Sequence, residues 1–322
     1  MRLKKSVKNL LLLFIPLLIG CGIIFYQFSS LSENELNNIE NSLLHANYFY
    51  IFLSLLVALL SHWSRAFRCK FALEHLGYTT KISTNFLAVC VSYLVNLTIP
   101  RSGEFTRAAL LKKYENVPFD KAFGTIVAER IVDLALFLLF VILGVLLQFD
   151  KLHQFLIDQQ VSLKTIAFAS IGIVLCGILF LLIWIYAEWS IIRKLKQKLS
   201  GLTEGILSVW YMEKKWRYIF HSMLIWLCYL VMFYIPIFAL PETEKIGFDI
   251  VIMGFIFGSL AIGFTNGGIG AFPFSIALIF GQYGIPEETS VAFGWLAWTS
   301  QTLLTLFLGL IGYLLLPLQS RK

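Results

Sequence analysis

The chain has 322 residues, of which 58% are hydrophobic and 14% are charged, and its formal net charge is +7. Soluble globular domains carry roughly 25% charged residues, so this composition excludes an ordinary water-soluble protein. Membrane proteins collect Lys and Arg in their cytoplasmic loops. The positive charge therefore reports orientation, and we expect no nucleic-acid partner.

Six segments are long and apolar enough to span a bilayer, which takes about 20 predominantly apolar residues. They are 10–28, 48–67, 131–148, 165–187, 218–240 and 290–316. Basic residues precede the first segment, as in a signal peptide, but the apolar run is long and no A-x-A cleavage pattern follows it. We therefore predict a retained helix and a cytoplasmic N-terminus.

Two shorter apolar segments, 84–100 and 249–264, each run into a break that contains Pro or clustered Gly. Such residues interrupt helices, and non-helical backbone at membrane depth persists only where protein or a water-filled cavity satisfies it. We predict two re-entrant helical hairpins, at 84–113 and 249–280. Ordinary kinked helices are the alternative.

Charge distribution favours the hairpins over eight full spans. If the first hairpin crossed the membrane completely, the basic segment 188–217 would lie outside, against the positive-inside bias. Two returning hairpins place this segment and both termini in the cytoplasm and leave mostly acidic loops outside. We expect 188–217 to be an amphipathic linker on the cytoplasmic surface, with a solvated loop as the alternative.

The order helix, hairpin, helix occurs in 48–148 and again, in the opposite orientation, in 218–316. Inverted repeats with interrupted segments at matching positions recur in transporters, which bind substrate where the broken helices meet. The sequence predicts an all-α polytopic membrane protein. It is a single integral membrane domain over 1–322, with about six transmembrane helices, two oppositely oriented re-entrant hairpins and an inverted-topology repeat.

Six ionisable residues remain at or near membrane depth: Arg101, Glu104, Arg107, Glu129, Arg130 and Asp133. Intramembrane charges are costly and mark pathways for polar substrates. Spacing predicts the i,i+3 pairs Glu104–Arg107 and Arg130–Asp133, and it places Glu129 on the same helical face as Asp133. The alternative is that these pairs neutralise one another and fasten the first hairpin to the next helix.

Arg101 and Ser102 lie in the first break, where a guanidinium could bind two phosphate oxygens and the following helix presents free N–H groups. In the second break, Gly267, Gly268 and Gly270 would let backbone N–H groups approach a ligand, and Asn266 adds a polar side chain. Glycines also permit tight helix packing, which is the alternative. We take these residues, together with Arg107, as the candidate substrate-binding set.

The stretch N-L-T-I-P-R-S-G-E-F-T-R at 96–107, followed by A-E-R-I-V-D at 128–133, resembles the lysylphosphatidylglycerol synthase transmembrane family. The glycine turn at 265–272 and the arginines near the end of helix 48–67 fit the same pattern. The resemblance implies a role in lipid movement: in multi-domain relatives, this domain moves an aminoacylated phospholipid between leaflets, and a fused soluble domain performs aminoacyl transfer. The chain ends at Lys322 without such a domain, so we do not expect aminoacyl transfer; stand-alone members are associated with glycolipid or polyprenyl-linked sugar pathways.

The leading hypothesis is a flippase-like translocase for an anionic phospholipid or a lipid-linked phosphate, in a bacterial cytoplasmic membrane. Partners would be lipids with phosphate headgroups, and a homo-oligomer is left open. Glu104, Glu129, Arg130 and Asp133 form the expected charge network, which would orient the arginines or exchange protons. A membrane-embedded lipid-modifying enzyme and a small-anion transporter are the alternatives.

Cofactors, catalytic residues and metals are not expected. No GxxxxGK[ST] pattern for nucleotide binding and no G-x-S-x-G elbow occur, and the five His and five Cys residues are dispersed without metal-ligand spacing. His62 and His221 lie far in sequence from the charged window.

Overall fold

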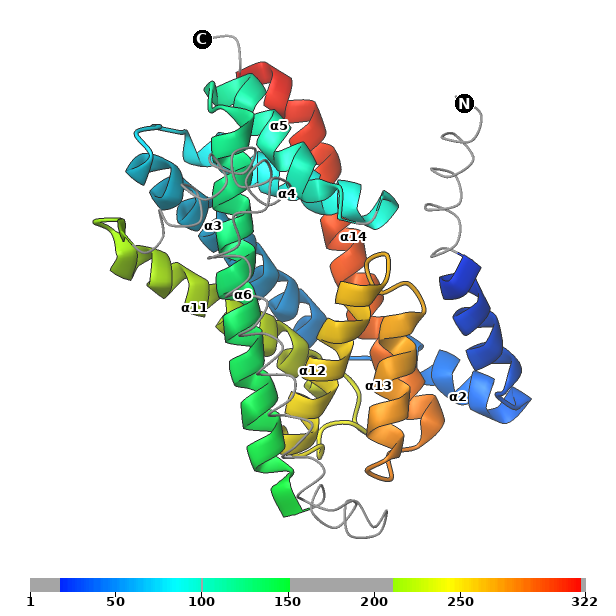
Figure 1. The fold of residues 1–322 in the computed structure, drawn as a ribbon. Coiled ribbons are helices and arrows are strands. Elements are labelled where there is room, and N and C mark those ends of the chain that lie inside the picture. Colours follow the sequence, from blue (N-terminus) through cyan, green and yellow to red (C-terminus); the bar gives the residue numbers. More distant parts are fainter. Residues whose placement is uncertain (1–17, 100, 151–210, 320–322) are drawn as a thin grey trace, which may run out of the picture.

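A computed structural model describes residues 18–99, 101–150 and 211–319 of the chain (Figure 1). After the helix Leu18–Ser29, the described elements are α2 (Glu33–Leu44), α3 (Tyr48–His75), α4 (Ile82–Thr98), α5 (Gly103–Glu115), α6 (Phe119–Leu147), α11 (Lys215–Tyr234), η1 (Ile235–Ala239), α12 (Phe248–Phe264), α13 (Ala271–Gly281) and α14 (Glu287–Gln319). All of these elements are helical, which confirms the all-α fold class.

Four helices are long and apolar enough to cross a membrane: α3, α6, α11 with its 3-10 extension η1, and α14. Each begins earlier or ends later than its predicted span; α3 continues to His75 and α6 already begins at Phe119. At 1.5 Å per residue α6 is about 44 Å long, more than the roughly 30 Å hydrocarbon core. Of the other two predicted spans, the first is described from Leu18 to Ser29, and 165–187 lies outside the described residues, as does most of the linker 188–217.

Two pairs of shorter helices form the segments predicted as hairpins. α4 and α5 are connected by residues 99–102, of which 99, 101 and 102 are described, and α12 and α13 are connected by a turn at 265–270. At the first turn the backbone N–H of Gly103 donates to Asn96 Oδ1 at 2.7 Å, and a Cβ on this glycine would collide with the Ser92 carbonyl. The absence of a side chain therefore lets α5 fold back closely against α4.

Corresponding helices of the two units run in opposite directions. Ser54 Oγ, near the start of α3, donates to the Met232 carbonyl near the end of α11 at 2.7 Å. Further along α3, Ser64 Oγ lies 2.8 Å from His221 Nδ1, near the start of α11. α3 and α11 are therefore antiparallel neighbours.

Four more helices pair across the two units in antiparallel fashion. Gln148, just past the end of α6, donates to Asp249 at the start of α12 at 2.7 Å. Ser83 at the start of α4 donates to Gln319 at the end of α14 at 2.8 Å. Because α6 is antiparallel to α12 and α4 to α14, the unit α11–α14 has the directions of the unit α3–α6 reversed. This is the arrangement that an inverted repeat requires.

The turn of the second hairpin packs on the end of α4 in the first hairpin. A Cβ at Gly267 in this turn would lie 2.5 Å from the side chain of Leu97, in the last turn of α4. Gly267 also has a φ of +62°, in the left-handed region that glycine adopts without a steric cost. Figure 1 shows the turn between α12 and α13 beside α14, facing the end of α4.

The outer surface of the long helices is apolar. On α6 the exposed side chains Leu134, Leu138, Ile142 and Leu146 recur every four residues and form one stripe. An exposed apolar stripe of this length is typical of a helix in contact with lipid. Arg65 and Arg68 of α3 and Glu129 and Asp133 of α6 are instead buried inside the molecule.

Candidate functional site

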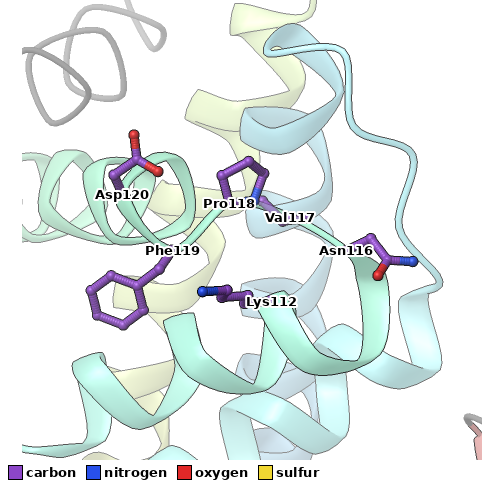
Figure 2. Close-up of a pocket in the computed structure, with 6 residues that line it drawn as sticks. All are labelled: Lys112, Asn116, Val117, Pro118, Phe119 and Asp120. Atoms are coloured by element: carbon purple, nitrogen blue, oxygen red, sulfur yellow. The ribbon is translucent and has the colours of Figure 1, made fainter.

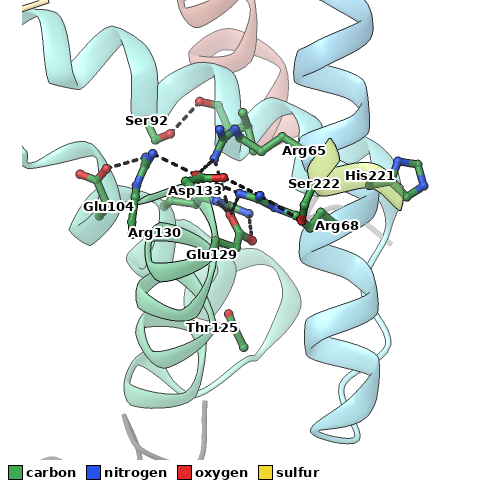
Figure 3. A network of polar contacts seen from close by, with 12 residues as sticks. Arg65, Arg68, Ser92, Glu104, Thr125, Glu129, Arg130, Asp133, His221 and Ser222 are labelled. Atoms are coloured by element: carbon green, nitrogen blue, oxygen red, sulfur yellow. Dashed lines mark hydrogen bonds and ion pairs between the residues drawn. The ribbon is translucent and has the colours of Figure 1, made fainter. Parts of the chain in front are cut away.

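Two arginines on α3, Arg65 and Arg68, are buried in the middle of the molecule (Figure 3). Arg68 donates two hydrogen bonds to Asp133, from Nη1 to Oδ1 at 2.6 Å and from Nη2 to Oδ2 at 3.1 Å. Its Nη2 also donates to Glu129 Oε2 at 3.3 Å, and Arg65 Nη1 donates to Asp133 Oδ2 at 3.2 Å. Both carboxylates come from the same face of α6, as their i,i+4 spacing predicts.

Arg107, on α5, completes the buried group. Its two terminal nitrogens form a bidentate pair with Glu129, Nη1 to Oε2 at 2.8 Å and Nη2 to Oε1 at 3.0 Å. The predicted i,i+3 contact between Glu104 and Arg107 is replaced by contacts with α6, since Glu104 accepts from Arg130 Nη2 at 2.7 Å. The other predicted pair is present, because Arg130 Nη1 lies 3.5 Å from Asp133 Oδ2. The second helix of the first hairpin, α5, is thus bound to α6 by two ion pairs.

The buried charges do not balance. Three guanidinium groups, those of Arg65, Arg68 and Arg107, face the two carboxylates of Glu129 and Asp133, and the Arg130–Glu104 pair adds one charge of each sign. We call these seven residues the ionic cluster; its formal charge is +1. The sequence predicted a balanced set of six because Arg65 and Arg68 were assigned to the cytoplasmic end of a span that extends further. Two arginines at i,i+3 on an otherwise apolar helix were the available signal.

Neutral side chains from α4 and α11 close the cluster on one side. Arg65 Nη2 donates to Tyr229 Oη at 2.8 Å, and this hydroxyl lies 3.2 Å from Tyr93 Oη. Trp226 Nε1 donates to Asp133 Oδ1 at 3.3 Å. These bonds matter because a buried charge is stable only when its donors and acceptors are satisfied.

The ionic cluster has one accessible edge, beside the turn of the first hairpin. The Arg130 side chain is 43% exposed, whereas Oε2 of its partner Glu104 is buried and has no hydrogen-bond partner among the described residues. Arg101 is exposed and has a φ of +57°, a left-handed conformation that is uncommon outside glycine. Ser102 Oγ is engaged with the Ile99 carbonyl at 2.6 Å. Among the described residues of the two hairpins and α6, Arg101 and Arg130 are thus exposed arginines, whereas Arg107 is buried against Glu129.

The second hairpin turn holds an unpaired polar side chain. Asn266 is 2% exposed, and within the described residues neither its amide oxygen nor its amide nitrogen has a partner. Gly267 accepts a hydrogen bond from Trp298 Nε1 at 2.8 Å, and Gly268 and Gly270 accept the backbone N–H groups of the first turn of α13.

The glycines of this turn are in close contact with their neighbours. A Cβ on Gly270 would lie 2.6 Å from the Gly20 carbonyl in the first helix, and one on Gly268 would lie 3.0 Å from Ile262. Tight packing and positive φ explain these glycines, which agrees with the alternative that the sequence left open for them.

Two other polar features lie away from the accessible edge of the ionic cluster. Ser64 and His221 resemble a nucleophile–base pair, but Ser64 is buried and the His221 ring stacks on Phe67, so the contact joins α3 to α11. An open depression of about 530 Å³ lies where α5 gives way to α6, at the opposite end of α5 from the hairpin turn (Figure 2). It is lined by Lys112, Asn116, Val117, Pro118, Phe119 and Asp120. Within the ranges described, no group of three metal-ligating side chains occurs.

A bundle of long apolar helices around a buried ionic cluster defines a polytopic α-helical membrane protein. Residues 13–311 match the family described as the lysylphosphatidylglycerol synthase TM region, and the chain belongs to that family. This confirms the resemblance seen in the sequence.

One curated relative is the UPF0104 membrane protein MJ1595 of Methanocaldococcus jannaschii, which is 32% identical over 139 residues. The match spans 42% of this chain and 39% of the relative, so the two chains are compared over only part of their length. No solved structure matches the chain.

Proposed function

We propose that the protein is a flippase-like translocase that moves a lipid with an anionic phosphate headgroup between leaflets. The observation that carries this proposal is the formal charge of +1 on the ionic cluster, buried in the middle of an apolar bundle. An uncompensated positive charge is costly in such surroundings, and an anionic ligand would offset the cost. A purely structural group of ion pairs would have no reason to carry the excess.

In this proposal the exposed and the buried arginines have different roles. Arg101 and Arg130 would bind the phosphate oxygens at the first hairpin turn, with the planar guanidinium matching two oxygens at once. Arg65, Arg68 and Arg107 are held by carboxylates and would supply a fixed positive field behind them. The Asn266 amide would bind the headgroup from the second turn, where Gly267 contacts Leu97 at the end of α4.

The lipid tails would remain outside, against the apolar surfaces beside the turns. Ile99 and Phe105 flank the first turn and Phe264 precedes the second, and all three are exposed. This arrangement suits an amphiphile whose headgroup enters between two hairpins while its acyl chains stay in the bilayer. A soluble anion would gain nothing from those apolar side chains, so the lipid proposal is preferred to the small-anion alternative.

We further propose that the hairpins enter a bacterial cytoplasmic membrane from opposite sides and that both termini are cytoplasmic. Lys112, Lys113 and Lys214 lie at one end of the long helices, whereas the acidic residues of α2 lie at the other. Cysteines introduced singly at Lys113 and Glu40 should react with an impermeant maleimide from opposite sides of sealed vesicles. Labelling of both from the same side would contradict this topology.

Transfer of a labelled lipid in reconstituted vesicles tests the function directly. Vesicles would contain fluorescent phosphatidylglycerol, with fluorescent phosphatidylcholine as the net-neutral comparison, and dithionite would report the outer-leaflet fraction. We expect Arg101→Ala and Arg130→Gln each to slow phosphatidylglycerol transfer at least tenfold. Lys112→Gln, which removes the same charge at the far end of α5, should transfer as the parent does.

The same vesicles separate the alternatives. Unchanged transfer in both arginine variants would overturn the assignment of the headgroup site. Uptake of inorganic phosphate without lipid transfer would favour a small-anion transporter. A change in the mass of the recovered lipid would favour a membrane-embedded enzyme; we expect the mass to stay the same.

A further inference from the structure

A single histidine, His62, lies at the midpoint of α3, the 28-residue helix that contributes Arg65 and Arg68 to the ionic cluster. Its Nδ1 is buried and has no hydrogen-bond partner among the described residues, although the ring as a whole is only partly buried. Ionisable residues at the centre of spanning helices are expensive, and histidines there commonly carry protons in pumps and transporters. His62 is not part of the headgroup site described above.

His62 is joined to the ionic cluster through two tyrosines. Its ring centroid lies 5.0 Å from that of Tyr93 on α4. The Tyr93 hydroxyl lies 3.2 Å from that of Tyr229 on α11, which in turn accepts from Arg65 Nη2 at 2.8 Å. Arg65 is also the charge nearest to His62 on its own helix, one turn away, and Arg130 of α6 acts on Tyr93 from the far side.

The groups facing His62 from these elements are therefore arginines and neutral tyrosines. Glu129 and Asp133 are occupied by the arginines and lie beyond them. A proton on His62 would raise the local formal charge from +1 to +2, which the low-dielectric interior disfavours. An anionic headgroup bound at the same cluster lowers the net local charge by one, and the cost of protonating His62 then falls.

We propose that His62 takes up one proton when the phosphate headgroup binds, so that lipid movement is coupled to proton movement. The inference rests on the proposed function, because the headgroup is the partner of the proton. The proton would come from the water phase on the loading side, bind His62 to form an imidazolium, and leave with the headgroup on the other side. Binding linkage is reciprocal, so proton and headgroup each raise the affinity for the other.

The coupling has a measurable size and sign. A singly charged lipid that moves with one proton carries no net charge, so its transfer is insensitive to membrane potential. At one proton per lipid, a gradient of one pH unit changes the steady-state leaflet ratio of the lipid about tenfold. The lipid accumulates in the leaflet facing the more alkaline compartment.

The experiment uses vesicles with labelled phosphatidylglycerol, a trapped pH-sensitive dye, and valinomycin to set the potential independently. The parent protein should show the tenfold leaflet ratio per pH unit, and lipid entry should acidify the lumen. His62→Gln should still transfer lipid, but its leaflet ratio should no longer follow the gradient. His221→Gln serves as the matched control and should keep the pH response, since His221 packs against Phe67 away from Tyr93.

The outcomes distinguish the two proposals. If the parent protein transfers lipid but ignores the pH gradient, or if His62→Gln follows the gradient as the parent does, proton coupling through His62 is wrong and the translocase proposal stands. If the parent protein transfers no lipid at any pH or gradient, the proposed function itself fails. A His62→Gln protein that does not fold is replaced by His62→Asn, which is judged by the same leaflet ratio.

Discussion

Removal of a carboxylate from the ionic cluster should destabilise the protein more than removal of an arginine. Glu129→Gln leaves three buried guanidinium groups facing Asp133 alone, whereas Arg107→Gln leaves two guanidinium groups facing two carboxylates. Glu129→Gln keeps the size and shape of the side chain, whereas Arg107→Gln also shortens the side chain and removes packing contacts. A larger loss of stability in Glu129→Gln than in Arg107→Gln would therefore report the charge balance of the cluster, because packing alone predicts the opposite order.

The magnitudes follow from the contacts. Glu129 accepts hydrogen bonds at 2.8 and 3.0 Å from Arg107 and at 3.3 Å from Arg68, and Arg65 lies 3.8 Å away. Loss of one partner of a buried ion pair costs about 3–5 kcal/mol. Because three arginines depend on it, we expect Glu129→Gln to reach the upper end of that range or exceed it. Arg107→Gln should lie near the lower end, at about 3 kcal/mol.

A half-exposed ion-pair group provides the control. Glu74 also contacts two cations, Lys214 at 2.9 Å and Lys70 at 3.6 Å, but the lysine side chains are 48% and 32% exposed. Glu74→Gln should change the stability by less than about 1 kcal/mol. Detergent-solubilised variants would be heated, and the folded fraction followed by circular dichroism and size-exclusion chromatography. A Glu129→Gln protein as stable as Arg107→Gln, or more stable, would refute the excess positive charge.

Three further predictions concern packing, topology and the second turn. Gly309→Ala should destabilise the protein by about 1–3 kcal/mol, because a Cβ there collides with Leu94 of α4, while Gly263→Ala, which meets nothing within 4 Å, should not; both are read from thermal denaturation. In a cysteine-free background, cysteines at Gln148 and Asp249 should be joined by a short bifunctional maleimide, since the native side chains meet there, and failure to cross-link would argue against the antiparallel packing of α6 on α12. Asn266→Leu should maintain or raise thermal stability, since an unpaired buried amide costs about 1–3 kcal/mol, yet it should slow lipid transfer; normal transfer would remove Asn266 from the site.

Much of the architecture could be predicted from the sequence, because apolar runs and helix-breaking residues are local features of the chain. Apolar runs of the right length gave the four long helices, and the Pro and Gly breaks gave both hairpins within a few residues of their observed ends. The Arg130–Asp133 contact and the shared face of Glu129 and Asp133 follow from helical spacing within α6.

The ion-pair partners of the charged residues could not be predicted, because they depend on contacts between helices that are far apart in the sequence. Glu104 and Arg107 have the spacing of a helical pair, but each is drawn to a different residue of α6 once α5 lies against it. Arg65 and Arg68 sit near the end of a predicted span, where the sequence alone does not distinguish a cytoplasmic arginine from a buried one.

The sequence by itself determined that the chain is a multi-pass helical membrane protein of this family, with two interrupted apolar segments and several charges between its apolar runs. Hydrophobic length and helix-breaking residues act along the chain, so a linear reading captures them. Only the tertiary structure decided that the cluster holds an excess arginine, that Arg130 rather than Arg107 is accessible, and that His62 adjoins the cluster through Tyr93 and Tyr229. Those facts depend on which faces of α3, α4, α6 and α11 meet, and that is settled by packing in three dimensions.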